Sequence, residues 1–284
     1  MFDLILENKA GDQLHFGMGT PFTISEIQGL NPPSATINTN EIALMDGAMY
    51  NSAKVQMRTI NVAFSIETSA AYNRIEVYKV LKSKQWIRLY YKSATRDVHI
   101  DGYISAIDVT HFAMKNVVTC SILCPSPFFK VAQEMVNEVS LTVSMFHFSF
   151  ASTEEPELVF GYIDPTVAIE IQNDGDVDTG LIVDLYAYGT ITNPKIFDYT
   201  TGKYIGLNYT MQIGDLITIN TNVGEKSIKL TRGGVETNIF NSLMKGSTWL
   251  QLPANGSVYT YEVGVGNAVA LNVQIKYNVL YEGV

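Results

Sequence analysis

The stretch Val55-Gln-Met-Arg58-Thr-Ile-Asn-Val-Ala-Phe-Ser-Ile66 indicates the fold class of the chain. From Ile60 onward, every second residue is apolar and the residues between are small or polar, which is the pattern of a strand with one buried face. Val55 and Met57 fall on the opposite phase, so we expect a β-bulge or a bend just before Ile60. The stretch therefore predicts a sheet that changes direction at its start.

Alternation of the same kind continues downstream. It predicts further strands at Trp86–Tyr91, Asp97–Ile104, Ile107–Phe112 and Val117–Cys124. The prolines of Pro125-Ser-Pro127 stop ladder pairing, so the last of these strands ends there.

One helix is predicted after residue 66. Thr68 or Ser69 is its expected N-cap, and the helix is expected to reach about Lys84. The residues predicted to lie on one helical face are Ala71, Ile75, Tyr78 and Leu81. The first part of the chain is thus predicted to be a β-sandwich or barrel-like domain with one packed helix.

The second part of the chain is predicted to be almost entirely strand and turn. Apolar alternation at 139–145 leads through residues 146–150 into a polar loop at 151–157, and the clearest strand runs from Val269 to Tyr281. A short helix is expected within Thr237–Lys245. Turn signals stand at Asn173-Asp-Gly175, Thr201-Gly202, Asn222-Val-Gly224, Arg232-Gly-Gly234 and Ala254-Asn-Gly256. This spacing predicts a second β-sandwich.

Length and charge both support two domains. A chain of 284 residues exceeds the usual size of one domain. Residues 1–135 carry 12 basic and 12 acidic residues, whereas residues 136–284 carry 7 and 16, so the net charge of −9 lies in the second part. We predict domains at 1–135 and 136–284. An acidic, unclustered surface argues against nucleic-acid and membrane-surface binding. The first residues do not have the pattern expected of a signal peptide, and the sequence contains no 18-residue apolar run.

The residue types that carry chemistry form no recognisable constellation. Cys120 and Cys124 lie about 13 Å apart on one predicted strand, too far for a disulfide, and are expected to be buried free thiols. The histidines are His15, His99, His111 and His147, none at helical metal-ligand spacing; we expect His99 to face solvent from a strand.

Sequence motifs of catalysis and cofactor binding are also missing. No nucleophile elbow, phosphate-binding loop or dinucleotide fingerprint occurs, and Gly17-Met-Gly19 and Gly264-Val-Gly266 are expected to be turns. Carboxylates from distant strands can converge into a glycosidase pair, but nothing in the sequence identifies one. We predict no enzyme, no cofactor and no catalytic or metal site.

Two binding alternatives remain open at this stage. Asp174, Asp176 and Asp178 resemble the start of a calcium loop, yet Thr179 and Leu185 replace its glycine and its bidentate acid, so an irregular calcium turn competes with a solvated acidic turn. The second alternative is a sugar-stacking platform, which would be formed by Trp249, Tyr259 and Tyr261, although core packing is the commoner use of such residues.

Several weak motifs occur in an order that resembles the distal tail proteins of long, non-contractile-tailed bacteriophages. These are Gly29-Leu-Asn-Pro-Pro33, Asp46-Gly47, the strand ending at Ile66, Ile100-Asp-Gly-Tyr-Ile104 and Cys124-Pro-Ser-Pro-Phe-Phe129. Residues 139–284, with Ile171-Gln-Asn-Asp-Gly, Thr201-Gly-Lys, Ile213-Gly-Asp and Trp249-Leu-Gln-Leu252, look like the galectin-like C-terminal β-sandwich of that family.

The resemblance implies a structural protein of the virion tail tip that is assembled in the host cytoplasm. It implies a homo-hexameric ring formed by the first domain, which joins the major tail protein to the tail-associated fibre or lysin protein. Tape measure and receptor-binding proteins are further candidate partners. The galectin sugar signature needs a histidine, and none follows His147, so we expect the second domain to be a docking platform. The alternative is a carbohydrate-binding or receptor-binding baseplate protein that recognises a host cell-wall polymer.

Overall fold

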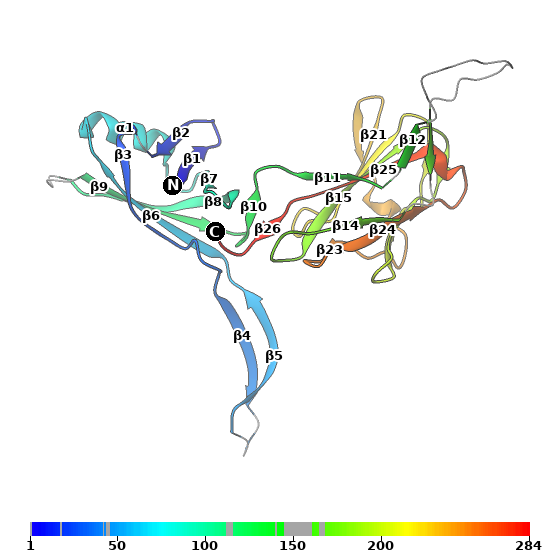
Figure 1. Cartoon of the computed structure of the whole chain (residues 1–284), viewed down its shortest axis with the longest axis horizontal. Helices are drawn as coiled ribbons and strands as arrows, with labels where there is room; N and C mark the ends of the chain where they lie inside the picture. The colour runs from blue at the N-terminus through cyan, green and yellow to red at the C-terminus, as the bar shows by residue number, and fades with distance from the viewer. Residues whose placement is uncertain are drawn as a thin grey trace. The chain divides into compact units, whose positions relative to one another are not determined.

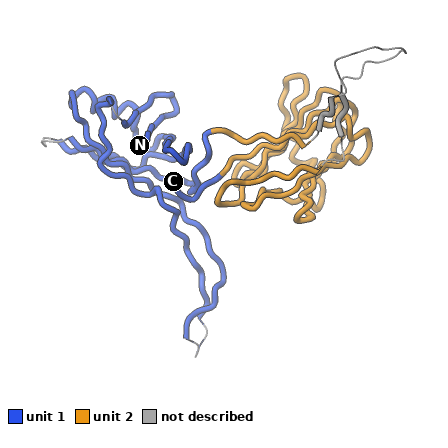
Figure 2. The backbone as a smooth tube through the Cα atoms, viewed as in Figure 1, with its two compact units in different colours: residues 1–132, 280–284 blue, residues 133–279 orange. Residues whose placement is uncertain are grey.

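The chain divides into two compact units that are described separately here (Figure 2). Unit 1 consists of residues 1–132 and 280–284, and unit 2 of residues 133–279. The computed structural model describes residues 2–17, 19–41, 43, 46–111, 116–139, 141–144, 161–164 and 168–284, with the backbone alone at 141–144 and 161–164. Unit 2 is therefore an insertion into the chain of unit 1, and residues 280–284 belong to the same core as the N-terminal strands.

Unit 1 is built on one antiparallel sheet, in the order β2-β1-β7-β8-β9-β6-β3 (Figure 1). The strands are β1 (Asp3–Asn8), β2 (Gln13–Phe16), β3 (Phe22–Gln28), β6 (Arg58–Ile66), β7 (Trp86–Lys92), β8 (Asp97–Val109) and β9 (Asn116–Cys124). Ile60, Val62 and Phe64 of β6 are fully buried, as their alternation predicts. The two strands predicted at 97–104 and 107–112 are joined in one strand, β8, which has a register shift between Ile104 and Ala106 and ends at Val109. Phe112 lies outside the described residues.

The sheet curls without closing into a barrel. Its edge strands β2 and β3 are consecutive in the chain, but they do not pair with each other. Instead Phe16 of β2 and Phe22 of β3 both pack on Phe64, with ring centroids 4.8 and 5.8 Å away. Aromatic packing therefore joins the two edges where a barrel would have hydrogen bonds.

Helix α1 (Ala70–Val80) covers the core of unit 1 with a different face from the predicted one. It packs against β1, β2 and β6, and its buried residues are Val77 and Val80. Of the predicted apolar face, Leu81 is buried, as expected. Ile75 and Tyr78 are 54% and 39% exposed and Ala71 is exposed as well, so the prediction was wrong for these three. Ser69 is the N-cap residue, as one of the two predicted candidates, but it has a left-handed backbone and its side chain forms no capping bond. Among the described residues, no helix is long and apolar enough to cross a bilayer.

A two-stranded ribbon, which we call the arm, projects from the sheet of unit 1 (Figure 1). It consists of β4 (Ala35–Glu41) and β5 (Ala48–Val55), which pair only with each other. The predicted bend before Ile60 is the point where the chain leaves β5 for β6, with Gln56 and Met57 between the two strands. The phase flip in the sequence thus marks a change of sheet.

Residues near the chain end return to unit 1. Strand β10 (Phe129–Val131) pairs with both β8 and β26 (Leu280–Tyr281). The single strand predicted to run to Tyr281 was therefore wrong at its end: β25 (Leu271–Tyr277) stops four residues earlier, and Tyr281 lies in the other unit. Alternation continues across the break, so the sequence pattern does not reveal it.

Unit 2 is a sandwich of a larger and a smaller antiparallel sheet. The larger has the order β11-β25-β15-β20-β21-β22, with β23 attached to β15, and the smaller has the order β14-β24-β17-β18. The larger sheet consists of β11 (Met135–Glu138), β15 (Thr179–Ala187), β20 (Leu216–Asn220), β21 (Ser227–Arg232), β22 (Val235–Asn238), β23 (Gln251–Leu252) and β25. The smaller sheet consists of β14 (Ile169–Ile171), β17 (Lys195–Asp198), β18 (Lys203–Gly206) and β24 (Ser257–Glu262).

Short elements complete unit 2. They are the strand pairs β12 (Leu141–Ser144) with β13 (Gly161–Asp164) and β16 (Ile191–Thr192) with β19 (Thr210–Met211), and the 3₁₀ turns η1 (Phe240–Ser242) and η2 (Ala268–Ala270). The turn η1 lies inside the predicted helix. Gly233 and Gly234 have φ of 58° and 79°, which fits the tight hairpin predicted between β21 and β22. The predicted loop at 151–157 lies outside the described residues.

The buried face of α1 supplies a test of the fold. Val77→Ala should lower the free energy of unfolding by roughly 1.5–3 kcal/mol, because it deletes two methyl groups from a filled core. Ile75→Ala on the exposed face is the matched control and should change stability by less than about 0.5 kcal/mol. Urea unfolding at low protein concentration measures both. A larger loss for Ile75→Ala than for Val77→Ala would show that α1 uses the face predicted from the sequence.

Candidate assembly interface

One buried arginine holds the base of the arm. Arg58 is 4% exposed and lies at the start of β6. Its Nε donates to the carbonyl oxygen of Pro127 at 2.8 Å, and its Nη1 donates to those of Gly29 and Asn31 at 2.6 and 2.9 Å. Its Nη2 donates to the carbonyl oxygen of Glu282. One guanidinium thus bonds to the loop before the arm, to the connection between β9 and β10, and to the C-terminal segment at Glu282.

The surroundings of Arg58 explain why this residue type is needed. Burial lowers the pKa of its guanidinium, and the ring of Phe129 lies 4.6 Å from the guanidinium carbon, where it stabilises the cation. The planar fork of arginine directs several N–H groups at separate carbonyls, which a lysine ammonium cannot do. Gly29 has φ +90°, and a Cβ there would lie 2.2 Å from the carbonyl oxygen of Thr59, so the loop can approach only with glycine at that position.

The arm is exposed along nearly its whole length. All residues of β4 and the first seven of β5 are exposed, including Ile37, Met49 and Tyr50 at 63%, 57% and 67%. Tyr50 pairs with Thr39, which lies on the same face of β4 as Ile37, so these two apolar side chains share one face. A ribbon of two strands is marginally stable in water by itself. The arm therefore has the exposure expected of a segment that another surface covers.

The outer face of α1 is a second exposed apolar surface on unit 1. Tyr72, Ile75 and Tyr78 recur at every third position and are 68%, 54% and 39% exposed. On the same helix, Lys79 forms an ion pair with Glu76 at 2.6 Å. Arm and helix face are different surfaces of the same chain, which matters for the type of symmetry that they can build.

The histidines considered in the sequence analysis have different surroundings. His15 contacts Gln13 at 2.9 Å and His111 contacts Arg74 at 3.2 Å, whereas His147 lies outside the described residues. His99 was predicted to face solvent, and this was wrong, because it is only 9% exposed.

The environment of His99 favours its neutral form. Burial and the cation of Arg88 lower its pKa to about 4, against the opposing effect of Asp101, and Lys130 lowers it further. Its Nδ1 has no hydrogen-bond partner in the part of the chain that the structure describes. A histidine in this environment stays neutral near pH 7.

The two cysteines are buried and free, as predicted. Burial raises the pKa of Cys120 and Cys124 to about 12, so both remain protonated thiols at neutral pH. Such thiols pack as small apolar groups and are poor nucleophiles.

The acidic turn after β14 is organised by an amide side chain. Asn173 is 6% exposed; its Nδ2 donates to the carbonyl oxygen of Val177 at 3.1 Å and its Oδ1 accepts from the backbone of Gly175 at 3.0 Å. Asp178 accepts from the backbone N–H of Ala254 at 3.1 Å. Over the described residues, no group of three or more acidic, histidine or cysteine side chains is placed to hold a metal ion.

The predicted sugar platform is not assembled. Tyr259 and Tyr261 are 0% and 3% exposed, because they alternate inward on β24, which agrees with core packing and not with the sugar-platform alternative. Trp249 is half-buried and stacks on Phe240 with ring centroids 5.6 Å apart. The two tyrosines therefore belong to the core of unit 2.

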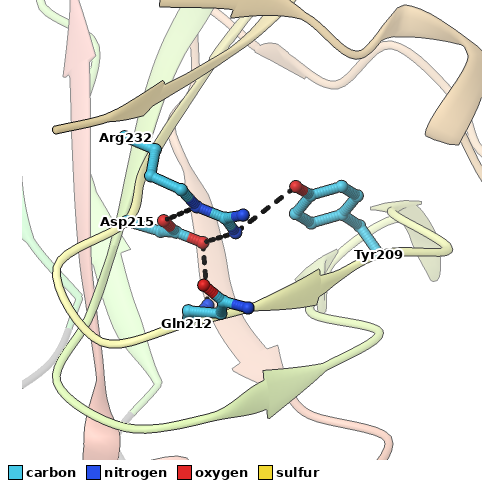
Figure 3. A network of polar contacts seen from close by, with 4 residues as sticks. All are labelled: Tyr209, Gln212, Asp215 and Arg232. Atoms are coloured by element: carbon cyan, nitrogen blue, oxygen red, sulfur yellow. Dashed lines mark hydrogen bonds and ion pairs between the residues drawn. The ribbon is translucent and has the colours of Figure 1, made fainter. Parts of the chain in front are cut away.

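A polar network at the rim of unit 2 is structural in character (Figure 3). Asp215 is fully buried and accepts two hydrogen bonds from Arg232, at 2.7 and 2.6 Å. It also accepts from the backbone of Gln212 at 2.7 Å, and Tyr209 lies 3.5 Å from the same guanidinium. The hydrogen bonds from Arg232 hold the pKa of Asp215 below its ordinary value. The network fixes the turn before β20 to the end of β21.

Comparison with known proteins places the chain in a family. A family model described as a phage tail protein RIFT-related domain matches residues 9–124, and the model of the siphovirus-type tail component, C-terminal domain, matches residues 174–281. The chain belongs to the siphovirus-type distal tail proteins. The two matched regions lie within unit 1 and mostly within unit 2, respectively.

Solved structures show that this tail protein shares its fold with known relatives. The crystal structure of the SPP1 Dit (gp 19.1) protein, described as a paradigm of the hub adsorption apparatus in Gram-positive infecting phages, has 14% identity and a TM-score of 0.69 over 98% of both chains. A chain of the phage P2 baseplate in its activated conformation with Ca has 12% identity and a TM-score of 0.53 over 100% of both chains. No curated protein sequence matches the chain.

The family motifs of this tail protein meet in space. Gly29-Leu-Asn-Pro-Pro33 and Cys124-Pro-Ser-Pro-Phe-Phe129 are far apart in the sequence, yet Arg58 donates to carbonyl oxygens in both. The role of Arg58 was not predicted. A signal was present, because Arg58 occupies the buried phase of its strand together with Ile60 and Val62, where an unpaired charge is out of place.

Arg58 of the tail protein should be irreplaceable by lysine. Arg58→Lys keeps the charge but leaves several buried carbonyls without a donor, so we expect a loss of roughly 2–4 kcal/mol in the free energy of unfolding. Arg74→Lys on α1 is the matched control and should stay within about 0.5 kcal/mol. Urea unfolding measures both, and a tolerated Arg58→Lys would contradict the role of the guanidinium fork.

His99 should make the tail protein less stable in mild acid. Its folded pKa is lowered to about 4, so its contribution is complete above the unfolded value of about 6.5 and is lost as the pH falls towards 4. Between pH 7.5 and 5 we expect unit 1 to lose on the order of 1–2 kcal/mol from this residue. His99→Gln should reduce that loss, and an unchanged pH dependence would show that His99 does not cause it.

Proposed function

We propose that this distal tail protein is a structural adaptor of the phage tail tip that assembles through unit 1 into a hexameric ring. The observation that carries the proposal is the pair of exposed apolar surfaces on unit 1, the arm and the outer face of α1. The solved structures that resemble this chain are a hub protein and a baseplate component. This similarity supports an assembly role over a catalytic one.

The geometry of the two surfaces favours a closed ring. A contact between the same patch on two copies gives a dimer, whereas a contact between two different patches propagates from copy to copy and closes when the rotation allows. In our proposal the arm of one copy covers the face of α1 formed by Tyr72, Ile75 and Tyr78 on the next copy. Six such contacts complete the ring and cover apolar residues that the single chain leaves in water.

The ring joins other tail proteins by its two faces. By its resemblance to the family, we propose the major tail protein on one side and the tail-associated fibre or lysin protein on the other, with the virion tail tip as its location. Unit 2 would then be a docking platform, for which receptor-binding proteins are candidate partners. The alternative of a carbohydrate-binding or receptor-binding baseplate protein has less support, because Tyr259 and Tyr261 are buried and offer no stacking surface for a sugar.

Light scattering coupled to size exclusion tests the ring. Six copies of 31.5 kDa give about 189 kDa, and the protein should approach this mass as its concentration rises. The double variant Ile37→Asp, Tyr50→Asp should remain a folded monomer, because it places charges on the apolar face of the arm. Tyr199→Asp, at a 76% exposed tyrosine of unit 2, is the control and should leave the mass unchanged. A hexamer that survives the double variant would exclude the arm as the contact.

A further inference from the structure

Residues 280–284, which we call the clasp, occupy a site on unit 1 at the foot of the arm. Strand β26 at the start of the clasp pairs with β10, with Tyr281 opposite Phe129 and Leu280 opposite Lys130. Tyr281 and Val284 pack against the core of unit 1. We propose that unit 1 has a peptide-binding site whose occupant is the clasp, and that this occupancy fixes the arm.

The second half of the clasp contacts the arm base. The backbone N–H of Val284 donates to the carbonyl oxygen of Leu30 at 3.2 Å, and the carbonyl oxygen of Glu282 accepts from Arg58. Gly283 lies so close that a Cβ there would be 3.1 Å from Cδ of Pro32. These contacts reach the loop that leads directly into β4. At the end of this loop, the carbonyl oxygen of Ser34 accepts a hydrogen bond at 3.0 Å from the backbone N–H of Gln56, which follows β5.

The first half of the clasp is anchored by an aromatic side chain. The guanidinium carbon of Arg96 lies 3.5 Å from the ring centroid of Tyr281, a close cation–π contact. Tyr281 therefore joins three things in one residue: the ladder with β10, the core of unit 1 and the cation of Arg96. An anchor of this kind, followed by backbone contacts, is how sheets bind added strands.

The clasp also links the arm to unit 2 through the chain. Unit 2 ends at Val279, one residue before β26, and begins at Gln133, two residues after β10. Both connections thus leave unit 1 from the same short ladder. Displacement of unit 2 would act first on β26 and then, through Glu282 and Arg58, on the loop at the arm base. The clasp is the segment through which the docking platform and the ring-forming arm influence each other, and this last step rests on the proposed function.

Hydrogen exchange on the protein shortened after Val279 tests the site. Without the clasp, the amides of β4 and β5 should exchange at least about tenfold faster, while those of β15 in unit 2 keep their protection. A synthetic peptide with the sequence of residues 278–284, added in trans, should restore slow exchange in the arm. The same peptide with Tyr281→Ala should fail to do so.

If the shortened protein fails to fold its unit 1 sheet, a single substitution in the full chain still tests the inference. Tyr281→Ala in the full chain should speed arm exchange with β6 and β9 still protected, and Tyr199→Ala on unit 2 should not. Unchanged arm exchange in both the shortened protein and Tyr281→Ala would overturn the inference. Exchange is measured at a protein concentration at which light scattering shows only the monomer, so the result is independent of ring formation. Ring formation at higher concentration together with unchanged arm exchange would refute the clasp alone.

Discussion

A single buried cation determines how the parts of unit 1 meet. Arg58 has been removed from water, and its charge is stabilised by backbone carbonyls and the face of Phe129. Removing a guanidinium from water is costly, and the cost is offset only if its N–H groups find acceptors at the right places. The loop at Gly29, the end of β9 and the segment near Glu282 must therefore stand in fixed positions. The arm begins at this point, so its direction depends on the same set of bonds.

The remaining architecture separates stability from assembly. The curled sheet, closed at its edges by Phe16, Phe22 and Phe64, supplies a core that needs neither the arm nor the outer face of α1. Those two elements carry apolar side chains that contribute little to the isolated chain and are free to contribute to contacts between copies. Unit 2 has its own two-sheet core and is inserted where β10 and β26 pair. Such a division would allow one chain to serve as both the ring subunit and the docking platform that we propose.

The sequence predicted what local periodicity controls. Alternation and turn chemistry account for strand β6, the buried thiols, the glycine turns of unit 2 and the mostly β fold class. Features that depend on distant contacts were missed. Val77 and Val80, not Ile75 and Tyr78, face the core because the position of α1 over β1, β2 and β6 decides its buried face.

The errors at the candidate sites have the same origin. His99 alternates as an exposed residue would, yet neighbouring side chains bury it, and Tyr259 and Tyr261 are core residues of β24. The break before β26 is invisible because alternation persists across two strands that belong to different units. Arg58 differs from these residues, because its role could have been inferred locally. A charged residue at a buried position of a strand implies that acceptors from elsewhere in the chain surround it.

A three-dimensional reconstruction of the assembled protein by electron microscopy would test the central claim most directly. The account predicts six copies around an axis, with unit 1 forming the ring and each arm lying on α1 of the neighbouring copy, over Tyr72 and Ile75. A ring joined through unit 2, or one in which the arms remain in solvent, would contradict it.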